Sequence, residues 1–312
     1  MEYFSITLNQ IFIFIIYAAI GIIAVKTKVL NRDGLNAISR FITKISLPLM
    51  VFTNTINGVT REQILQGWPV MVLSVVMYLL TYLVAVGLSK FFPLKGNELK
   101  VYRACTMFGN VGFMGIPLIT ALFPEKGMLY IVLFTVMDQL VLWTVGVKLT
   151  TPIETEKGLS VAQSLKKMIN PAMVGILLAV AIVFIDVQLP ELLNTALVKT
   201  GAVTTPMAMI YLGGLFCFTN IGTYIKKPEF YCSIVVKMCI FPVLFYYLLC
   251  LIPGIGKDVA MTMSVLSALP TMTTIAMLAQ IQKSAGEYAA GSIFVTTLFS
   301  IVTLPLICLF MR

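Results

Sequence analysis

The stretch FGNVGFMGIPL, residues 108–118, decides how this chain folds, because it sets three glycines and a proline inside an apolar run. Gly is a poor helix former and Pro removes an amide donor, so a helix over this run should unwind. Asn110 lies at the edge of the expected break and offers both donors and an acceptor. The alternative reading is a glycine-lined contact between two helices, with Asn110 hydrogen-bonded across it.

The composition places this run in a membrane. Of the 312 residues, 59% are hydrophobic and 11% are charged, whereas a soluble domain carries about a quarter charged residues. A surface so short of charge would aggregate in water, so the partner of this chain is a lipid bilayer. The net charge of +9 does not indicate nucleic acid, because the basic residues lie in short loops between apolar runs.

We predict an all-α polytopic membrane protein with ten transmembrane helices. A span needs about twenty apolar residues, and the ten runs are 5–26, 36–57, 66–90, 100–123, 127–148, 169–187, 196–221, 229–251, 258–282 and 287–311. Cytoplasmic loops carry an excess of Lys and Arg. If both termini are extracytoplasmic, only five of the 22 basic residues lie outside, namely Arg61, Lys126, Lys199, Lys257 and Arg312.

Four prolines indicate an internal repeat. Pro48 and Pro117 lie in spans 2 and 4, and Pro206 and Pro270 lie in the corresponding spans 7 and 9. Single prolines are common in membrane helices, but four in register favour duplication. Five spans are an odd number, so the second copy is inverted, as in many secondary transporters. The chain then divides into a first five-span repeat (1–148), a cytoplasmic loop (149–168) whose second part fits a short amphipathic helix, and a second repeat (169–312).

Span 9 offers a partner for the break in span 4. Its stretch SALPTMTTIAMLAQ, residues 267–280, surrounds Pro270 with hydroxyl side chains, Thr271 among them. Hydroxyls can coordinate a carboxylate or a cation, or satisfy the carbonyls of their own helix. The start of either half-helix would present free amides and a positive dipole end, which fits an anion. Unwound carbonyls fit Na⁺ instead.

Span 5 carries an acid. Asp138 and Gln139 lie near its middle, and an intramembrane acid is a functional candidate by default. Asp138 could carry a coupling proton, coordinate a cation, pair with a basic residue or form a structural hydrogen bond. The other deep ionisable residue, Lys237, is expected to extend toward the cytoplasmic edge.

The motifs resemble the auxin efflux carrier family, which includes the plant PIN carriers. The resemblance rests on FGNVGFMGIPL and continues in SLPLMVF (46–52), QLVLWT (139–144), ALPTMTTIAMLAQ (268–280) and LPLICLFM (304–311). It implies the fold of bile-acid symporters and related antiporters, in which broken spans 4 and 9 cross at the midplane. It further implies a scaffold of spans 1, 2, 6 and 7 that forms a homodimer, and a transport domain of spans 3–5 and 8–10 that moves as an elevator.

The resemblance also implies a substrate site. In PIN carriers the matching positions of Asn110, Pro117, Gln139 and Pro270 meet a carboxylate; Gly112 and Thr271 lie within the two breaks and join them as candidate contacts. Asp138, where PIN carriers have a non-acidic residue, is the candidate for coupling or gating. The missing long hydrophilic loop is typical of bacterial members, for which malate or malonate transport in the inner membrane is the usual assignment; this argues against auxin.

The expected function is therefore secondary transport of a small organic anion by alternating access, with H⁺ or Na⁺ as the possible coupling ion. The alternative is a cation/proton antiporter or a Na⁺-coupled symporter on the same fold. An enzyme is not expected, because the chain has no His and a single deep acid. No bound cofactor or metal is expected, and the ATPase motif GxxxxGKS/T does not occur.

Overall fold

The structure of this protein is a computed structural model that describes residues 2–156 and 171–311. Every regular element in these two ranges is a helix, as the composition predicts. The first half contains α1 (Glu2–Lys26), α2 (Arg32–Phe41), α3 (Leu47–Gly58), α4 (Arg61–Gln66), α5 (Trp68–Ser89), α6 (Gly96–Met107), α7 (Ile116–Leu122), α8 (Gly127–Val141), α9 (Val147–Thr150) and α10 (Ile153–Glu156). The second half contains α12 (Pro171–Ile185), α13 (Glu191–Ala202), α14 (Thr204–Phe216), α15 (Ile221–Tyr224), α16 (Pro228–Ser233), α17 (Phe241–Cys250), α18 (Lys257–Ala268), α19 (Thr273–Ile281) and α20 (Gly286–Phe310).

Six helices of the described ranges are long and apolar enough to cross a membrane. They are Tyr3–Lys26, Arg32–Gly58, Trp68–Ser89, Gly127–Thr150, Pro228–Cys250 and Gly286–Phe310, which coincide with predicted spans 1, 2, 3, 5, 8 and 10. The other four predicted spans consist of shorter helices, because spans 4, 7 and 9 are each divided and span 6 is described only from Pro171. The amphipathic helix predicted in the second part of the 149–168 loop lies outside the described residues.

Wide helical turns of the π type adjoin three prolines. Each such turn ends two residues before Pro48, Pro117 or Pro242, and the turns span Ile42–Ser46, Val111–Gly115 and Ile234–Ile240. A proline ring clashes with the carbonyl four residues earlier and offers no N–H, so the preceding turn widens to accommodate it. The proline in span 2 therefore bends a helix without interrupting it, since Arg32–Gly58 remains continuous.

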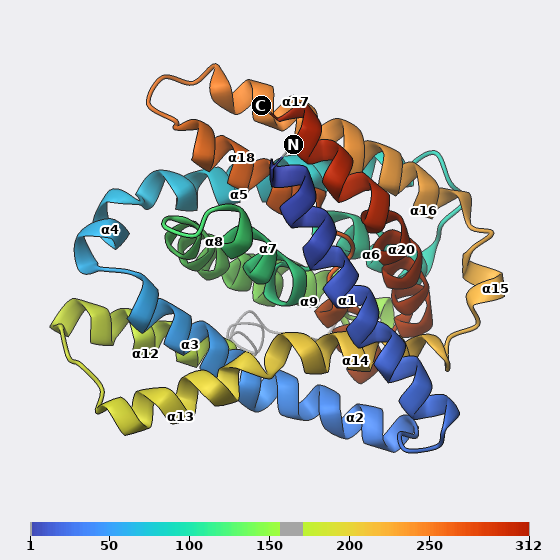
Figure 1. The fold of residues 1–312 in the computed structure, drawn as a ribbon. Helices are drawn as coiled ribbons and strands as arrows, with labels where there is room; N and C mark the ends of the chain where they lie inside the picture. Colours follow the sequence, from blue (N-terminus) through green and yellow to red (C-terminus); the bar gives the residue numbers. More distant parts are fainter. Residues whose placement is uncertain (1, 157–170, 312) are drawn as a thin grey trace.

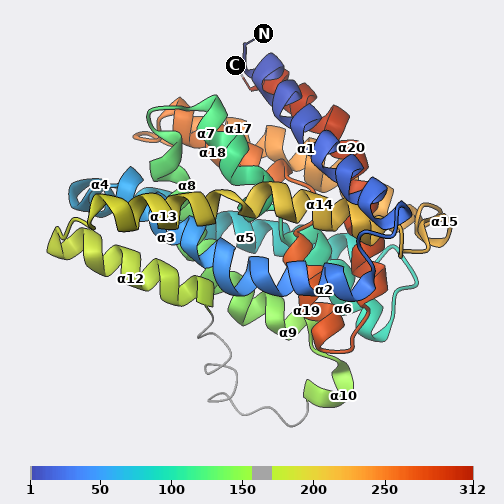
Figure 2. The same cartoon turned by 60° about the horizontal axis from the view of Figure 1, so that its bottom comes forward.

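Glycines set the closest helix contacts. α1 packs along α14, and an added methyl group would lie 1.9 Å from the Ala18 carbonyl oxygen at Gly213 and 2.0 Å from the Ile210 carbonyl oxygen at Gly21. Small residues let two backbones approach in this way where lipid gives little hydrophobic drive between helices. α3 packs on α12 and α13, and the four helices α2, α3, α12 and α13 lie together in Figure 2.

A second group of helices encloses the divided spans 4 and 9. α5 packs against α6, α8 and α18, and α20 packs against α6 and α19. The groups also touch, because α1 lies beside α20 and α3 beside α8. The chain termini lie together at one end of the molecule, where α1 begins and α20 ends (Figure 1).

Candidate functional site

The two divided segments meet each other at their breaks. α6 ends at Met107 and α18 ends at Ala268, and the extended residues that follow pair as an isolated antiparallel bridge between Gly109 and Thr271. The Asn110 N–H donates to the Pro270 carbonyl at 2.8 Å, and the Met272 N–H donates to the Phe108 carbonyl at 3.1 Å. Backbone groups freed by the breaks thus satisfy each other inside the protein, which is the condition for irregular backbone at membrane depth.

The glycines of span 4 fall into two kinds. A methyl group added at Gly109 would lie 3.0 Å from Leu269 Cβ, and one at Gly115 would lie 2.9 Å from Leu269 Cδ1. Gly109 and Gly115 therefore serve close packing against span 9, as the alternative reading proposed. At Gly112 the nearest atom would be Leu47 Cδ1 at 3.5 Å, an ordinary contact distance. Gly112 is thus the glycine of this run with room beside it.

Buried polar side chains hold the two breaks in place. Asn110 Nδ2 donates to Thr273 Oγ1 at 3.2 Å. The Thr271 N–H donates to Thr296 Oγ1 at 3.1 Å, and the Thr271 hydroxyl donates to the Cys105 carbonyl at 3.0 Å. Asn110 and Thr271 are both buried. The structure therefore brings three predicted site residues together, namely Asn110, Pro270 and Thr271.

Four amides beside the breaks lack a backbone acceptor in the described part of the chain. Beyond the break, the second half of span 4 begins at Val111 and α19 begins at Thr273. Within residues 2–156 and 171–311, no acceptor is found for the N–H groups of Gly112, Phe113, Thr273 and Thr274. The first amides of a helix have no partner in their own helix, and the helix dipole makes this end attractive to anions. Two such ends therefore lie beside the paired breaks around Gly109 and Thr271, which we call the crossing.

Asp138 is buried and held by two neighbours. Its side chain is 1% exposed; one carboxylate oxygen accepts a short hydrogen bond from the Tyr78 hydroxyl, and the other accepts from Gln139 Nε2 at 3.0 Å. Gln139 Oε1 accepts in turn from Trp143 Nε1 at 3.1 Å. A wide turn at Leu142–Gly146 contains Trp143, and such turns are frequent at functional sites.

The Asp138 network adjoins the crossing through aromatic rings. The ring of Tyr78 lies 5.4 Å from the ring of Phe108, centroid to centroid, and the carbonyl of Phe108 accepts the bond from Met272. Gln139 and Asn110 share no hydrogen bond in the described part of the chain. Pro117 is half-buried in the first turn of α7, beyond the wide turn that contains Gly112.

Lys237 lies in the interior, and the expectation that it extends to the cytoplasmic edge is wrong. Its side chain is 3% exposed, and Nζ donates a short hydrogen bond to the Leu269 carbonyl. In an unbroken helix that carbonyl would accept from the amide four residues later, but the break at Pro270 frees it. The ammonium group therefore replaces the missing helical donor, which no local pattern around Lys237 could reveal.

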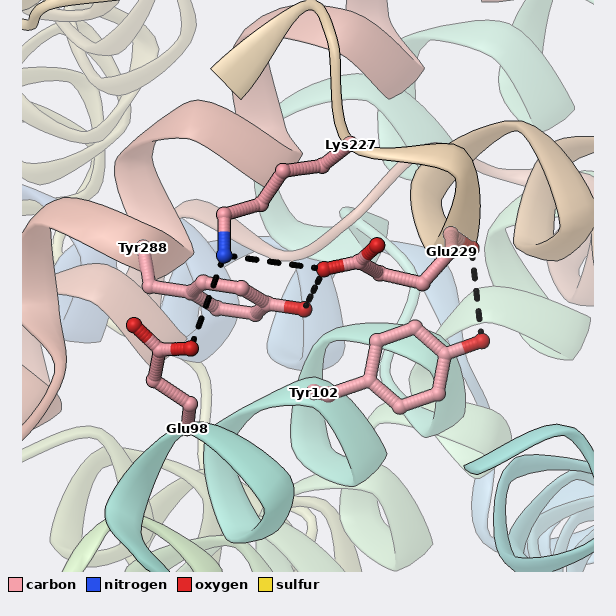
Figure 3. A network of polar contacts seen from close by, with 5 residues as sticks. All are labelled: Glu98, Tyr102, Lys227, Glu229 and Tyr288. Atoms are coloured by element: carbon pink, nitrogen blue, oxygen red, sulfur yellow. Dashed lines mark hydrogen bonds and ion pairs between the residues drawn. The ribbon is translucent and has the colours of Figure 1, made fainter. Parts of the chain in front are cut away.

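A second polar cluster lies where α6, α16 and α20 meet (Figure 3). Glu229 is 5% exposed, and its carboxylate accepts from the Tyr288 hydroxyl at 3.1 Å. Lys227 Nζ lies 3.7 Å from this carboxylate and 3.5 Å from that of Glu98. The Tyr102 hydroxyl donates to the Glu229 carbonyl at 3.3 Å. Glu229 is not predicted from the sequence, because it lies in the first turn of a helix at the edge of an apolar run.

Other candidate sites lie apart from the crossing. A cavity of about 780 Å³ lies between the ends of α3 and α12, with Arg61, Asp186 and Asn194 in its wall, and no predicted site residue lines it. Within the described ranges, no three His, Cys, Asp or Glu side chains are grouped so that they could hold a metal ion. The crossing is thus the place where the predicted residues gather.

Comparison with known proteins agrees with the sequence motifs. The model of the family described as "Membrane transport protein" matches residues 6–308. This chain belongs to that family. The resemblance to auxin efflux carriers, which are members of it, is thereby confirmed. This chain is also 22% identical over 310 residues to an uncharacterised transporter of Methanocaldococcus jannaschii. The match covers 96% of this chain and 97% of that relative.

Proposed function

We propose that this membrane transport protein is a secondary transporter of small organic anions, with a carboxylate such as malate or malonate as its substrate. One observation carries the proposal: beside a single crossing start two helix N-termini whose amides at Gly112, Phe113, Thr273 and Thr274 have no backbone acceptor in the described residues. A carboxylate bound there would accept from amides whose dipoles already favour negative charge. Alternating access would then arise when the transport domain that contains the crossing moves across the membrane as an elevator against the scaffold.

Side chains around the crossing support an anionic substrate. Lys237 contributes a buried positive charge at the Leu269 carbonyl, and Asn110 contributes an amide group at the break itself. Asp138 has its oxygens engaged by Tyr78 and Gln139. In this proposal Asp138 is coupled to the substrate through Gln139. The Gln139 amide donates either to Asp138 or to the bound carboxylate, but not to both.

Helix lengths support a crossing near the bilayer midplane. α6 and α18 are each 12 residues long, which gives about 18 Å at 1.5 Å per residue. The hydrocarbon core is about 30 Å thick, so each half-helix would end about half-way across. We extend the proposal to ten spans in two inverted repeats, with a scaffold of spans 1, 2, 6 and 7 that forms the dimer. Both termini lie on the extracytoplasmic side of the cell membrane.

Uptake of labelled malonate and malate into proteoliposomes tests the function. The transporter should take up at least one of them, and Asn110→Ala should lose most of that uptake while remaining folded. Asn57→Ala is the matched control, because Asn57 bonds Asn194 at the far end of α3 and not at the crossing. Full uptake by Asn110→Ala would contradict the assigned site, and no uptake of any carboxylate by the wild type would contradict the substrate class.

A cation/proton antiporter is the second candidate. The observation in its favour is the pair of buried ionisable side chains, Asp138 and Lys237, in the same group of helices. Buried charges at membrane depth commonly mark ion or proton pathways. A current on a solid-supported membrane that Na⁺ evokes without any organic anion would favour this function. A current that appears only with the organic anion would favour the first.

A further inference from the structure

A groove on the helix bundle combines a basic end with an apolar wall. The groove has a volume of about 640 Å³. It lies between α5, α6 and the helical segment Gly127–Thr150, which ends in α9. Lys100, Arg103 and Lys148 line one end of it. Val75 and Leu79 line the other end and are 48% and 57% exposed. No acidic residue is part of the lining in the described chain.

The two ends of the groove are separated along the helices. On α5 the lining runs from Val75 to Tyr82, and on the facing segment it runs from Val141 to Leu149. These stretches cover about 10 and about 12 Å of helix. The groove therefore changes from apolar to basic along the helix direction, toward the helix ends that we expect at the cytoplasmic surface.

Two of the three cations are held in position. Arg103 Nε donates to Ser89 Oγ at 3.1 Å, which orients the guanidinium group. Lys100 Nζ donates to the Thr151 carbonyl at 2.8 Å. Lys148 is exposed at the same end. An arriving anion thus meets groups that are already ordered, and loses less of its binding energy to fixing side chains.

We propose that this groove binds an anionic phospholipid, with its phosphate at Lys100, Arg103 and Lys148 and an acyl chain along Val75 and Leu79. A lipid matches both ends, because basic pockets between cytoplasmic helix ends attract anionic headgroups and the exposed apolar wall contacts acyl chains. A small dicarboxylate would leave that wall uncovered. The proposal goes beyond transport of organic anions and does not depend on it.

Lipid in this groove would touch the Asp138 network. Tyr78 lines the groove between the apolar and basic ends, and its hydroxyl donates to Asp138. Tyr78 is 1% exposed, so this one side chain separates a lipid in the groove from Asp138.

Native mass spectrometry of the full chain tests the site. The protein is offered equal amounts of phosphatidylglycerol and phosphatidylcholine with identical acyl chains, and the ratio of retained lipids is measured. The wild type should retain phosphatidylglycerol in excess. The double variant R103Q/K148Q should lower the ratio by about fivefold per removed cation. The control is K26Q/K44Q, which removes two cations on the same predicted side; Lys44 lines a separate apolar groove.

Three results would overturn the proposal. One is an equal ratio in the wild type and in R103Q/K148Q, with the melting temperature in phosphatidylcholine unchanged to exclude misfolding. The second is a loss of the excess in K26Q/K44Q as well, which would indicate general surface charge. The third is displacement of the lipid by glycerol 3-phosphate or malonate, which would make the groove a site for soluble anions.

Discussion

The amide of Asn110 donates to the carbonyl of Pro270 at 2.8 Å, so the broken helices of the two halves of the chain are joined backbone to backbone. The bond is possible because Pro270 and Asn110 both lie just beyond a helix end, after Ala268 of α18 and Met107 of α6. The side chain of Asn110 is thereby fixed toward Thr273 at 3.2 Å. Every prediction about the crossing depends on this arrangement.

Removing the charge of Lys237 should weaken substrate binding. In Lys237→Met the shape of the side chain is roughly kept, but the ammonium at the Leu269 carbonyl is lost. A positive charge beside the crossing attracts a bound carboxylate, so its removal should lower carboxylate affinity by about tenfold, which corresponds to about 1.4 kcal/mol. Isothermal titration with malonate measures this. Unchanged affinity would show that Lys237 serves only the helix break.

The bond between Tyr78 and Asp138 should appear as a coupling energy. Tyr78→Phe removes the donor and Asp138→Asn removes the carboxylate, so either variant should lose about 1 kcal/mol or more of stability. The double variant should lose less than the sum of the two, because both changes remove the same bond. Thermal unfolding in detergent compares the four proteins. Strictly additive losses would mean that the contact contributes no stability.

Gly109 and Gly112 should differ when each is changed to alanine. Gly109→Ala sets a methyl group 3.0 Å from Leu269 Cβ and 3.1 Å from the Leu266 carbonyl oxygen, so the crossing must shift and stability should fall by about 1–3 kcal/mol. Gly112→Ala meets no atom closer than 3.5 Å and should fold normally. If Gly112 contacts substrate, that variant should lose uptake while keeping its melting temperature. Normal uptake would remove Gly112 from the site.

The contact between α1 and α14 should tolerate no added methyl group. In Gly213→Ala the new carbon would lie 1.9 Å from the Ala18 carbonyl oxygen, which is backbone and cannot rotate away. We expect a loss of about 1–3 kcal/mol, or more if the helices separate. Gly87→Ala in α5 is the control, because no atom lies within 4 Å of its added carbon; it should be neutral or slightly stabilising. Equal melting temperatures would contradict the close contact.

The breaks themselves could be predicted because their cause is local. Glycine and proline disfavour a helix wherever they occur, so residues 108–118 and 267–280 each predict a break, and the structure has one in each run, at 108–110 and 269–272. Pro48 and Pro117 show the limit of this argument, since the helix widens before each of them and continues instead of ending. Whether a proline bends or interrupts a helix depends on what its neighbours offer to the freed backbone groups.

The partners of the buried charges could not be predicted, because they come from helices far apart in the sequence. Tyr78 meets Asp138 from another span, and Lys237 meets a carbonyl that exists only because a different helix is broken. Glu229 accepts from Tyr288, which is 59 residues later on α20, whereas its second partner, Lys227, is only two residues earlier in the loop before α16. A single sequence shows that a buried charge needs a partner, but only the packing of the helices names it.

The start of α1 and the end of α20 lie close enough to suggest a test of the order in which the chain folds. α1 and α20 lie side by side, and α1 begins where α20 ends (Figure 1). The Thr7 hydroxyl lies 3.5 Å from the Cys308 sulfur. A short linker could therefore join the last residue to the first, and a cut in the 149–168 connection would open the ring there. Such a circular permutant, which would be synthesised second half first, should fold to the same bundle. The order in which the two halves are synthesised would then not determine the fold.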